Sequence, residues 1–364
     1  MSDTHRRYSA IEQALRQVIP TQAASHREQH LHTLAALICG IVGAKQTQFP
    51  KIADQAPSAG AKRESRITRF ERWIDNRAVT YDTFFLPHAR ALLTALSTQP
   101  LVLVMDGSTV GRGCLALLVN VVYYGRALPI IWVVVKGKKG HFPEATHCAL
   151  IAQVRPLIPA GAQVIFLGDG EFDGTDLQAT IAGYGWQYVC RTATTTLIWC
   201  GDARIHFGDL GVRRDDAVAI ADAAVTAARY GPVLALAVWE ADQQAPLYLV
   251  SNLATPEAAI AWYRKRFRIE TFFSDQKSRG FQIHKSHLAK PARVFRLLLA
   301  ACLAYLWIVY LGSVAQQDDW IPILQRTNRC DLSLFQLGLS LLAHCLNEDL
   351  PFPVAFQLAF APSG

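Results

Sequence analysis

The chain has 364 residues, a net charge of +7 and an apolar fraction of 51%, enough for a folded enzyme core with accessory domains and too apolar for a mainly disordered chain. Its eight cysteines stand singly without a CxxC pair, so neither a zinc site nor a redox centre is expected. Single cysteines in apolar runs are typical of a reducing cytosol, and we expect a cytoplasmic protein.

Residues 1–98 are predicted to form a helical DNA-binding domain. The third and fourth predicted helices resemble a helix-turn-helix, and Arg66, Arg69 and Arg72 recur every three residues on one face of the fourth. Thirteen Lys or Arg against eight acids in residues 1–95 favour contact with DNA phosphates or a groove; the alternative is an exposed basic helix without a partner. Apolar spacing near 3.6 predicts these helices: Tyr8–Val18, His26–Gly43, Phe49–Ala56, Lys62–Asp75 and Tyr81–Leu96.

Residues 99–191 are predicted to form an α/β core. Helices are expected at Glu144–Ile158 and Asp173–Tyr184, and the order βββαβαβ predicts a meander to which the later strands add in parallel. This is the order of the ribonuclease H-like mixed sheet. Short β-branched runs with Gly at their breaks predict the strands: Leu101–Met105, Cys114–Tyr123, Leu128–Val135, Gln163–Leu167 and Trp186–Arg191.

Two aspartates follow strands that this order makes parallel neighbours. Asp106 comes after the first strand and Asp169 after the fourth, so both side chains are expected at one sheet edge. Carboxylates so placed repel each other unless a divalent cation lies between them. Asp173 or Asp176 would replace Asp169 if the fourth strand ended later.

The third strand should run parallel to the first, so the loop after it opens on the same edge. That loop carries Lys136, Lys138 and Lys139. It is predicted to track DNA phosphates, with a solvated turn as the alternative.

Residues 192–251 are predicted to be a small β insertion, with one helix at Asp222–Arg229. Its strands are expected at Arg204–Phe207, Ala217–Ile220, Val233–Trp239 and Leu247–Val250. Residues 252–290 return to the core as a helical stretch from Thr255 to about Arg279.

Four side chains in that helical stretch share one stripe. At 100° per residue, Tyr263, Arg266, Glu270 and Lys277 fall within a band of about 60°. An i, i+4 salt bridge explains Arg266 and Glu270 but leaves the tyrosine and the lysine unexplained. Ten Lys or Arg against two acids in residues 261–300 again favour a polyanionic partner.

Residues 291–364 are predicted to be helical, with helices at Ala292–Val314, Ser333–Leu346 and Ile321–Thr327. The most apolar run, residues 297–312, falls short of the roughly 20 residues that cross a bilayer. A buried core helix is expected, with a short membrane anchor as the alternative.

The spacing Tyr-x2-Arg-x3-Glu-x6-Lys, present as Tyr263, Arg266, Glu270 and Lys277, resembles the signature of the insertion-sequence-4 type of DDE transposases. These are cut-and-paste enzymes with a ribonuclease H-like core and a β insertion before the glutamate helix. Asp106, followed by Gly-Ser-Thr, resembles the first aspartate of that family.

The resemblance implies that Asp106, Asp169 and Glu270 hold two Mg²⁺ ions, for which Mn²⁺ can substitute, and that the protein acts as a homodimer on the inverted repeats of a transposon and on target DNA. Tyr263, Arg266 and Lys277 would hold phosphates near the scissile bond. Several family members excise through a DNA hairpin, and Tyr248 or Trp239 would stack on a flipped base.

Three other functions compete with this one. A ribonuclease H-like nuclease or resolvase would cut without joining, and a transposase-derived protein could bind DNA without catalysis. An α/β enzyme whose GDGEFDG run cradles a phosphate is disfavoured, because that run lacks the spacing of known phosphate loops.

Overall fold

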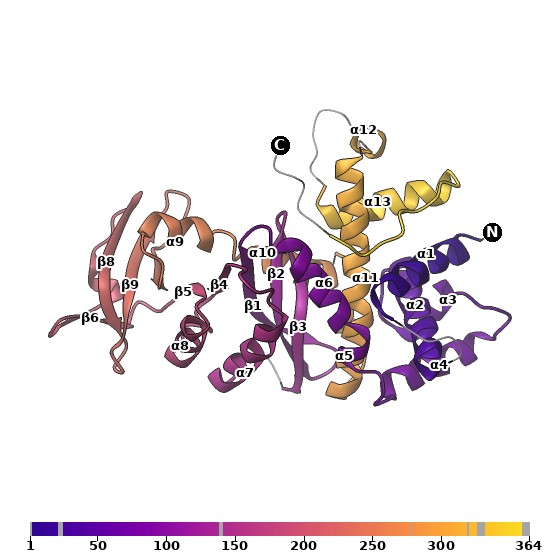
Figure 1. Ribbon diagram of the computed structural model, residues 1–364, viewed down its shortest axis with the longest axis horizontal. Coiled ribbons are helices and arrows are strands. Elements are labelled where there is room, and N and C mark those ends of the chain that lie inside the picture. The colour runs from indigo at the N-terminus through magenta and orange to yellow at the C-terminus, as the bar shows by residue number, and fades with distance from the viewer. Residues whose placement is uncertain are drawn as a thin grey trace.

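The computed structural model describes residues 2–20, 25–137, 141–277, 279–318, 320–325 and 332–358. A ten-stranded mixed sheet extends through the molecule in the order β3-β2-β1-β4-β5-β10-β9-β8-β6-β7. Figure 1 shows β8 and β9 at one end of the long axis and the N-terminal helices at the other. The strands are β1 Leu101–Val110, β2 Cys114–Tyr123, β3 Arg126–Lys136, β4 Val164–Gly168, β5 Gln187–Arg191, β6 Leu197–Cys200, β7 Ala203–His206, β8 Asp216–Val225, β9 Tyr230–Trp239 and β10 Leu247–Ser251.

Helices flank the sheet and form the N-terminal and C-terminal parts of the chain. The predicted N-terminal helices are confirmed, except that the last is divided at Phe85, which leaves the helical conformation at φ −129°. The α-helices are α1 Asp3–Val18, α2 His26–Ala44, α3 Phe49–Gln55, α4 Arg63–Asp75, α5 Tyr81–Phe84, α6 Leu86–Leu96, α7 Glu144–Val154, α8 Thr175–Gly183, α9 Pro256–Tyr263, α10 Arg268–Gln276, α11 Pro291–Gln317, α12 Ile321–Leu324 and α13 Leu334–Asn347.

The half of the sheet from β3 to β5 has the predicted strand directions. β1 and β2 pair antiparallel, as do β2 and β3, while β4 pairs parallel to both β1 and β5. β3 therefore runs parallel to β1. The carboxyl ends of β1, β3 and β4 consequently lie toward the same edge of the sheet.

The strands of residues 192–251 continue the same sheet rather than forming a separate one. β10 pairs antiparallel with β5, and β9 pairs with both β10 and β8. The helix predicted at Asp222–Arg229 is wrong, because β8 runs through Val225 and pairs with β9. The register shifts after Ile220, and Asp222 has a φ of 52°. This bulge breaks the period-two alternation, and strand pairing overrides the helix propensity of the alanines.

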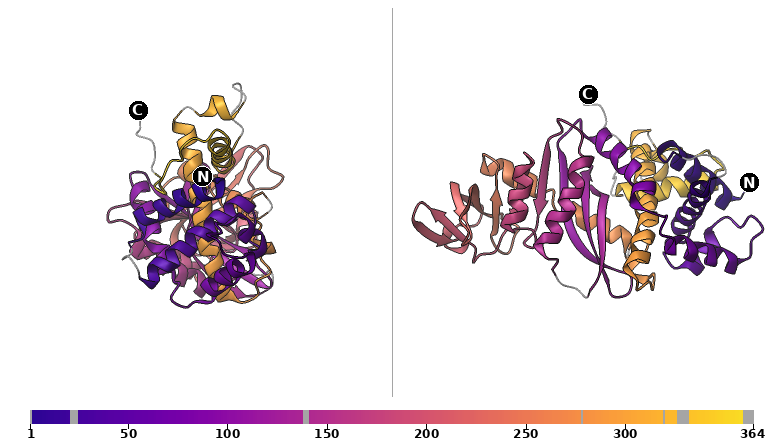
Figure 2. Two further views of the ribbon diagram at one scale, coloured as in Figure 1. Left: turned by 90° about the vertical axis from the view of Figure 1, so that its right-hand side faces the viewer. Right: turned by 60° about the horizontal axis from the view of Figure 1, so that its bottom comes forward.

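Helix α11 is the main buried helix and lies between the sheet and the N-terminal helices (Figures 1 and 2). Its length and composition would suffice to cross a membrane, but 89% of its most apolar window is buried inside the protein. It contacts α2, β3 and α13. Gly312 lies so close to α13 that a Cβ there would be 1.9 Å from the carbonyl oxygen of Leu334. The prediction of a core helix is confirmed in this structure.

Candidate active site

Asp106 and Asp169 lie at the same level of two adjacent parallel strands. Val104 of β1 pairs with Leu167 of β4. Asp106 comes two residues after Val104 in the chain, and Asp169 comes two residues after Leu167. The prediction that the first strand ends at Met105 is wrong, because β1 continues to Val110 in a hairpin with β2. Asp106 is thus anchored within a paired strand, while Asp169 directly follows β4 as predicted.

The electrostatic environment of Asp106 disfavours its charge. Burial, followed by the neighbouring carboxylates of Asp169 and Glu171, raises the pKa of Asp106 to about 6. The backbone N–H of Gly107, 2.7 Å from Oδ1, and the Arg266 guanidinium partly offset this rise. A cation bound beside these carboxylates would stabilise the ionised form of Asp106.

Arg266 connects the second aspartate to Glu270. Its Nη1 lies 3.5 Å from Asp169 Oδ2 and its Nη2 lies 3.3 Å from Glu270 Oε1. The Arg266 side chain is only 10% exposed, whereas that of Glu270 is 60% exposed. Among the described residues, no three His, Cys, Asp or Glu side chains are grouped closely enough to hold a metal ion. In this structure Glu270 does not contact the aspartates directly; the Arg266 guanidinium lies between Glu270 and Asp169.

The predicted single helix from Thr255 to Arg279 is wrong, because it is interrupted between α9 and α10. Through Arg266 and Ile269 the backbone forms i to i+3 hydrogen bonds, from Arg266 N to Tyr263 O and from Ile269 N to Arg266 O. Such tight turns advance about 120° per residue instead of 100°, so the predicted stripe is not continuous. The interruption leaves Tyr263 at the buried end of α9 and lets Arg266 reach Asp169.

Tyr263 lies beneath the site rather than on its surface. It is 2% exposed, and burial raises the pKa of its phenol, with Arg266 and Arg191 acting in the opposite direction. This degree of burial contradicts the prediction that Tyr263 holds a phosphate directly, and a packing role fits its position.

Lys277 reaches the site from the end of α10. Its Nζ donates to the Ser108 hydroxyl, and it lines a cavity of about 480 Å³ together with Asp106. His141 and Glu171 line the same cavity. A cation, a hydroxyl and two carboxylates therefore face one space.

Glu171 was not singled out from the sequence, although it stands two residues after Asp169. Its Oε1 accepts from the backbone N–H of Phe142 at 2.7 Å, and its Oε2 lies 3.2 Å from His141 Nδ1. Glu171 thereby fastens the chain that follows β3 to the turn that carries Asp169. The signal in the sequence was the acidic GDGEFDG run, which alone does not say what Glu171 contacts.

Phe267 is a second residue that sequence reasoning missed. It is 52% exposed, and the Arg266 guanidinium lies 4.8 Å from the centre of its ring. Leaving an aromatic ring in water forgoes the stabilisation that burial would give, so its exposure beside the carboxylates is a feature of the site. Nothing in the pattern of the helix distinguished it from the buried phenylalanines nearby.

Other predicted site residues lie away from this cavity. Lys136 is exposed at the end of β3, whose direction is as predicted, while Lys138 and Lys139 lie outside the described residues. Tyr248 packs its ring against Phe207 at 6.1 Å between centroids, and Trp239 Nε1 donates to the carbonyl of Gln243. Both aromatic rings are thus engaged in packing.

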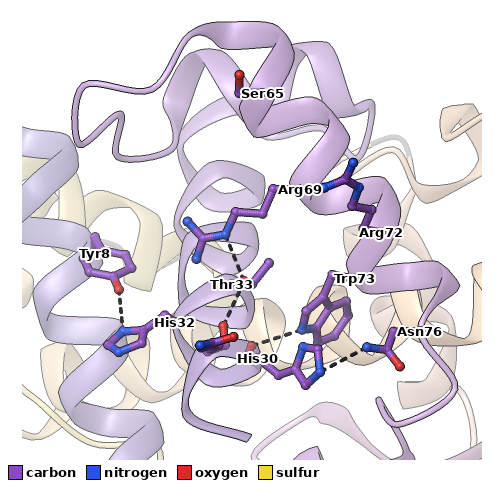
Figure 3. A pocket seen from close by; sticks show the side chains of 10 residues that line it. Tyr8, His30, His32, Thr33, Ser65, Arg69, Arg72, Trp73 and Asn76 are labelled. Atoms are coloured by element: carbon purple, nitrogen blue, oxygen red, sulfur yellow. Dashed lines mark hydrogen bonds between the residues drawn. The ribbon is translucent and has the colours of Figure 1, made fainter. Parts of the chain in front are cut away.

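The three predicted DNA-binding arginines of α4 border cavities that residues of α1 and α2 also line. Arg66 donates to the carbonyl of Ala56, and Arg69 donates to the Thr33 hydroxyl. Arg72 lines a cavity with Arg69 (Figure 3). The helical face is as predicted, and on it Arg69 and Arg72 are exposed.

A protein-family model described as "Transposase DDE domain" matches residues 98–307. This range is more than half of the chain and includes every residue of the aspartate site. The chain belongs to the transposase DDE domain family. No curated protein matches this transposase.

The transposase shares its fold with a solved structure described as a piggyBac transposase synaptic complex with hairpin DNA. The TM-score is 0.50 at 9% sequence identity, over 99% of this chain and 86% of that chain. The crystal structure of human ENDOV matches with a TM-score of 0.26 at 15% identity, over 53% of this chain and 92% of that chain. A score that low does not bear on the fold. Within the transposase DDE domain lie Asp106, Asp169, Glu270 and Lys277, whereas the α4 arginines precede it.

Proposed function

We propose that this DNA transposase is of the insertion-sequence-4 type and excises and inserts an element by cut-and-paste. The observation that carries the proposal is the pair Asp106 and Asp169, level with each other on adjacent parallel strands and joined to Glu270 through Arg266. The spatial order β3-β2-β1-β4-β5 in one half of the sheet supports a ribonuclease H-like core. The strands from β6 to β10 would be its insertion.

The carboxylates fit two Mg²⁺ ions, or Mn²⁺ in their place. The fit rests on the hard oxygen ligands and on the pKa of Asp106, which burial and Asp169 raise, because a divalent cation would relieve that repulsion. Asp106, Asp169 and Glu270 would hold the ions. Bound in such sites, paired metal ions activate the attacking oxygen and stabilise the leaving one.

Glu270 would have to leave Arg266 to join the two aspartates. Its 60% exposed side chain has the freedom for this, and it begins from the first turn of α10, where the helix dipole favours negative charge. Arg266 would then be available to a phosphate. One guanidinium would hold the carboxylates in place before DNA binds and hold the DNA strand afterwards.

Lys277 and Ser108 would orient the strand that is cut. Their contact places a cation on the wall of the cavity that contains Asp106, and a cation there would bind a phosphate oxygen next to the scissile bond. Lys136, at the carboxyl end of β3, would contact the DNA farther along, with Lys138 and Lys139 extending this contact.

DNA is the proposed partner, in the form of transposon end repeats and target DNA, bound by a homodimer in the bacterial cytoplasm near the nucleoid. The similar solved structure is itself described as a complex with hairpin DNA, which supports DNA as a partner. A hairpin step in this transposase stays a hypothesis. Because Tyr248 and Trp239 are packed, the exposed ring of Phe267 is the better candidate to stack on an unpaired base.

The decisive experiment is cleavage of the element's own end sequence with Mg²⁺ by the intact chain and by Glu270→Ala. We expect nicking and strand transfer only with the intact chain, while both bind the DNA. Equal cleavage by the two proteins would rule out the assignment. A labelled-end assay that shows cutting without joining would favour the nuclease or resolvase alternative, and binding without cutting would favour a transposase-derived DNA-binding protein.

A further inference from the structure

A series of contacts through Glu171 connects the two aspartates of the site. It begins at Asp169, whose Oδ1 accepts from the backbone N–H of Glu171 at 2.9 Å. The Glu171 side chain extends to the segment between β3 and α7, where its Oε1 accepts from the backbone N–H of Phe142 at 2.7 Å. Glu171 therefore contacts Asp169 with its backbone and Phe142 with its carboxylate.

Phe142 continues the connection to Asp106. Phe142 is buried, and its ring lies on Gly107, where an added Cβ would be only 3.1 Å from a ring carbon. Gly107 directly follows Asp106, and its N–H donates to Asp106 Oδ1 at 2.7 Å. The missing side chain at Gly107 thus lets the ring rest on β1 beside the first aspartate. We call Glu171, Phe142 and Gly107 together the Glu171 clamp.

The clamp lies where the two strands stop holding each other. Among the described residues, Val104 and Leu167 are the last pair of the ladder between β1 and β4. Beyond this level β1 continues alongside β2, while the chain after β4 turns at Asp169, whose carbonyl accepts from the Phe172 N–H. The separation of Asp106 from Asp169 is therefore not fixed by the ladder itself, and the clamp spans the interval beside it.

The Glu171 carboxylate is surrounded by groups of the protein. Its Oε2 lies 3.2 Å from His141 Nδ1, and its Oε1 lies 3.6 Å from Nε2 of the buried His147. The Glu171 side chain is 15% exposed, in contrast to the open position of Glu270. Although Glu171 lines the same cavity as Asp106, its surroundings suit a group that holds the chain rather than one that binds a metal ion.

We propose that Glu171 is a positioning residue for the transposase reaction, and that the Glu171 clamp fixes Asp169 relative to Asp106 before metal ions and DNA bind. The proposal rests on the proposed function, because it assumes that these two aspartates form the metal site. Glu171 acts through the hydrogen bond that it accepts from Phe142 and does not itself hold a metal ion. Such positioning matters because a displacement of about 1 Å can lower a rate about a hundredfold.

Two substitutions separate the contact from the charge. Glu171→Gln loses the charge but keeps an oxygen that accepts from the Phe142 N–H, whereas Glu171→Asp keeps the charge and is too short to reach it. With the element's end sequence and Mg²⁺ both saturating, Glu171→Gln should cleave within about threefold of the intact chain and Glu171→Asp about a hundredfold more slowly. The dissociation constant for DNA should not change. The matched controls are the same substitutions at Glu257, an exposed residue of α9.

A second measurement needs neither metal nor DNA. Hydrogen–deuterium exchange of the Phe142 amide should be slow in the intact chain and in Glu171→Gln, and at least about tenfold faster in Glu171→Asp. Phe142→Leu keeps the N–H and removes the ring that lies on Gly107. If the clamp acts as one unit, the double variant Glu171→Asp with Phe142→Leu should cleave no more slowly than Glu171→Asp alone.

Three results would overturn the proposal. Slow cleavage by Glu171→Gln with a protected Phe142 amide would mean that Glu171 acts through its charge, as a metal ligand would. Cleavage by Glu171→Asp at the rate of the Glu257 control would show that the contact has no part in the reaction. Effects of Glu171→Asp and Phe142→Leu that multiply would show that the two residues act separately.

The outcomes also distinguish this proposal from the proposed function. If Glu270→Ala is inactive and Glu171→Asp cleaves normally, the catalytic assignment stands and the clamp proposal fails. If Glu270→Ala cleaves like the intact chain, while Glu171→Asp exposes the Phe142 amide and loses cleavage, the clamp stands and the assignment of Glu270 fails.

Discussion

The aspartate site and the basic face of α4, formed by Arg66, Arg69 and Arg72, both contain arginines, but these arginines have different surroundings. In the aspartate site, Arg266 lies between Asp169 and Glu270 and is 10% exposed on its side chain. On α4, Arg69 donates to the Thr33 hydroxyl, lines an open cavity and forms no ion pair with the other described residues. The first arginine contacts the protein's own carboxylates, and the second is exposed to solvent.

This difference predicts a separation of effects. Changes at the aspartate site should alter the rate of DNA cleavage at saturating DNA, whereas changes of the α4 arginines should alter affinity and its salt dependence. The following variants test that separation, beginning with the largest expected effect.

Asp106→Asn should reduce cleavage by at least about a thousandfold, because the variant keeps the shape of the side chain but loses an anionic metal ligand. The same change should stabilise the metal-free protein by on the order of 1 kcal/mol, since the pKa of Asp106 is raised to about 6 and its ionisation at neutral pH costs free energy. Cleavage rates and chemical denaturation would measure the two effects.

The matched control for Asp106→Asn is Asp82→Asn, an exposed carboxylate on α5. It should leave both cleavage and stability unchanged. A gain in stability without a loss of cleavage would place Asp106 outside the reaction, and an unfolded Asp106→Asn protein would contradict the electrostatic account.

Arg266→Lys should lower the rate of cleavage about a hundredfold at saturating DNA, because one ammonium group lacks the fork with which the guanidinium would hold Asp169 and a phosphate at the same time. The dissociation constant for the duplex should change little. The comparison with Arg69→Lys is direct, since that variant should weaken binding and preserve the rate once DNA is saturating. The separation of the two regions fails if both variants change the same parameter.

The N-terminal helices and the aspartate site also differ in how pH affects stability. His88 on α6 is fully buried, and burial lowers its pKa to about 4, so the unfolded chain binds the proton more readily between that value and about 6.5. Stability is therefore full above pH 6.5 and is lost as pH falls toward 4. Asp106 has the opposite effect on stability. Its pKa is raised in the folded chain, so its contribution to stability is present at low pH and is lost as pH rises toward 6.

His88→Leu isolates the histidine contribution. Between pH 7 and pH 5 the intact chain should lose about 2 kcal/mol of stability relative to this variant, as measured by urea denaturation. His26→Gln, at an exposed histidine of α2, serves as the control and should follow the intact chain. Parallel curves for the intact chain and His88→Leu would show that His88 is not neutral in the fold.

Periodicity and propensity predicted most of the elements because those elements are amphipathic or β-branched over their whole length. The parallel pairing of β1 with β4 also followed from the order of strands and helices, and with it the approach of Asp106 to Asp169. Other elements depend on pairing with strands that are distant in the chain, and these could not be predicted from the local sequence. Asp222 lies in a bulge of β8 that only its partner β9 defines, and alanines there suggested a helix.

The division of the glutamate helix is a second example. The spacing of Tyr263, Arg266 and Glu270 predicted one face of one helix, but the backbone turns tightly at Arg266, whose side chain contacts Asp169. Residue spacing within the helix does not reveal a contact with so distant a part of the chain. The same applies to the α4 arginines. Their helical face was visible in the sequence, but the cavities that this face borders with α1 and α2 depend on how the helices are arranged in space.

The smallest predicted effect concerns Phe267, the residue before α10, compared with Phe272 inside that helix. Phe272 is 1% exposed and packs on Tyr305, so Phe272→Ala should cost about 3–5 kcal/mol of stability. Phe267 is 52% exposed, and Phe267→Ala should change stability by less than about 0.5 kcal/mol. Its effect should instead be on cleavage, with a loss of about tenfold, because stacking of an aromatic ring on an unpaired base contributes about 1–3 kcal/mol. Phe267→Trp should retain activity and Phe267→Leu should not, since only the former keeps an aromatic face. If Phe267→Ala cleaves and joins DNA at the normal rate, the ring has no part in the reaction, and its exposure reflects only its contact with Arg266.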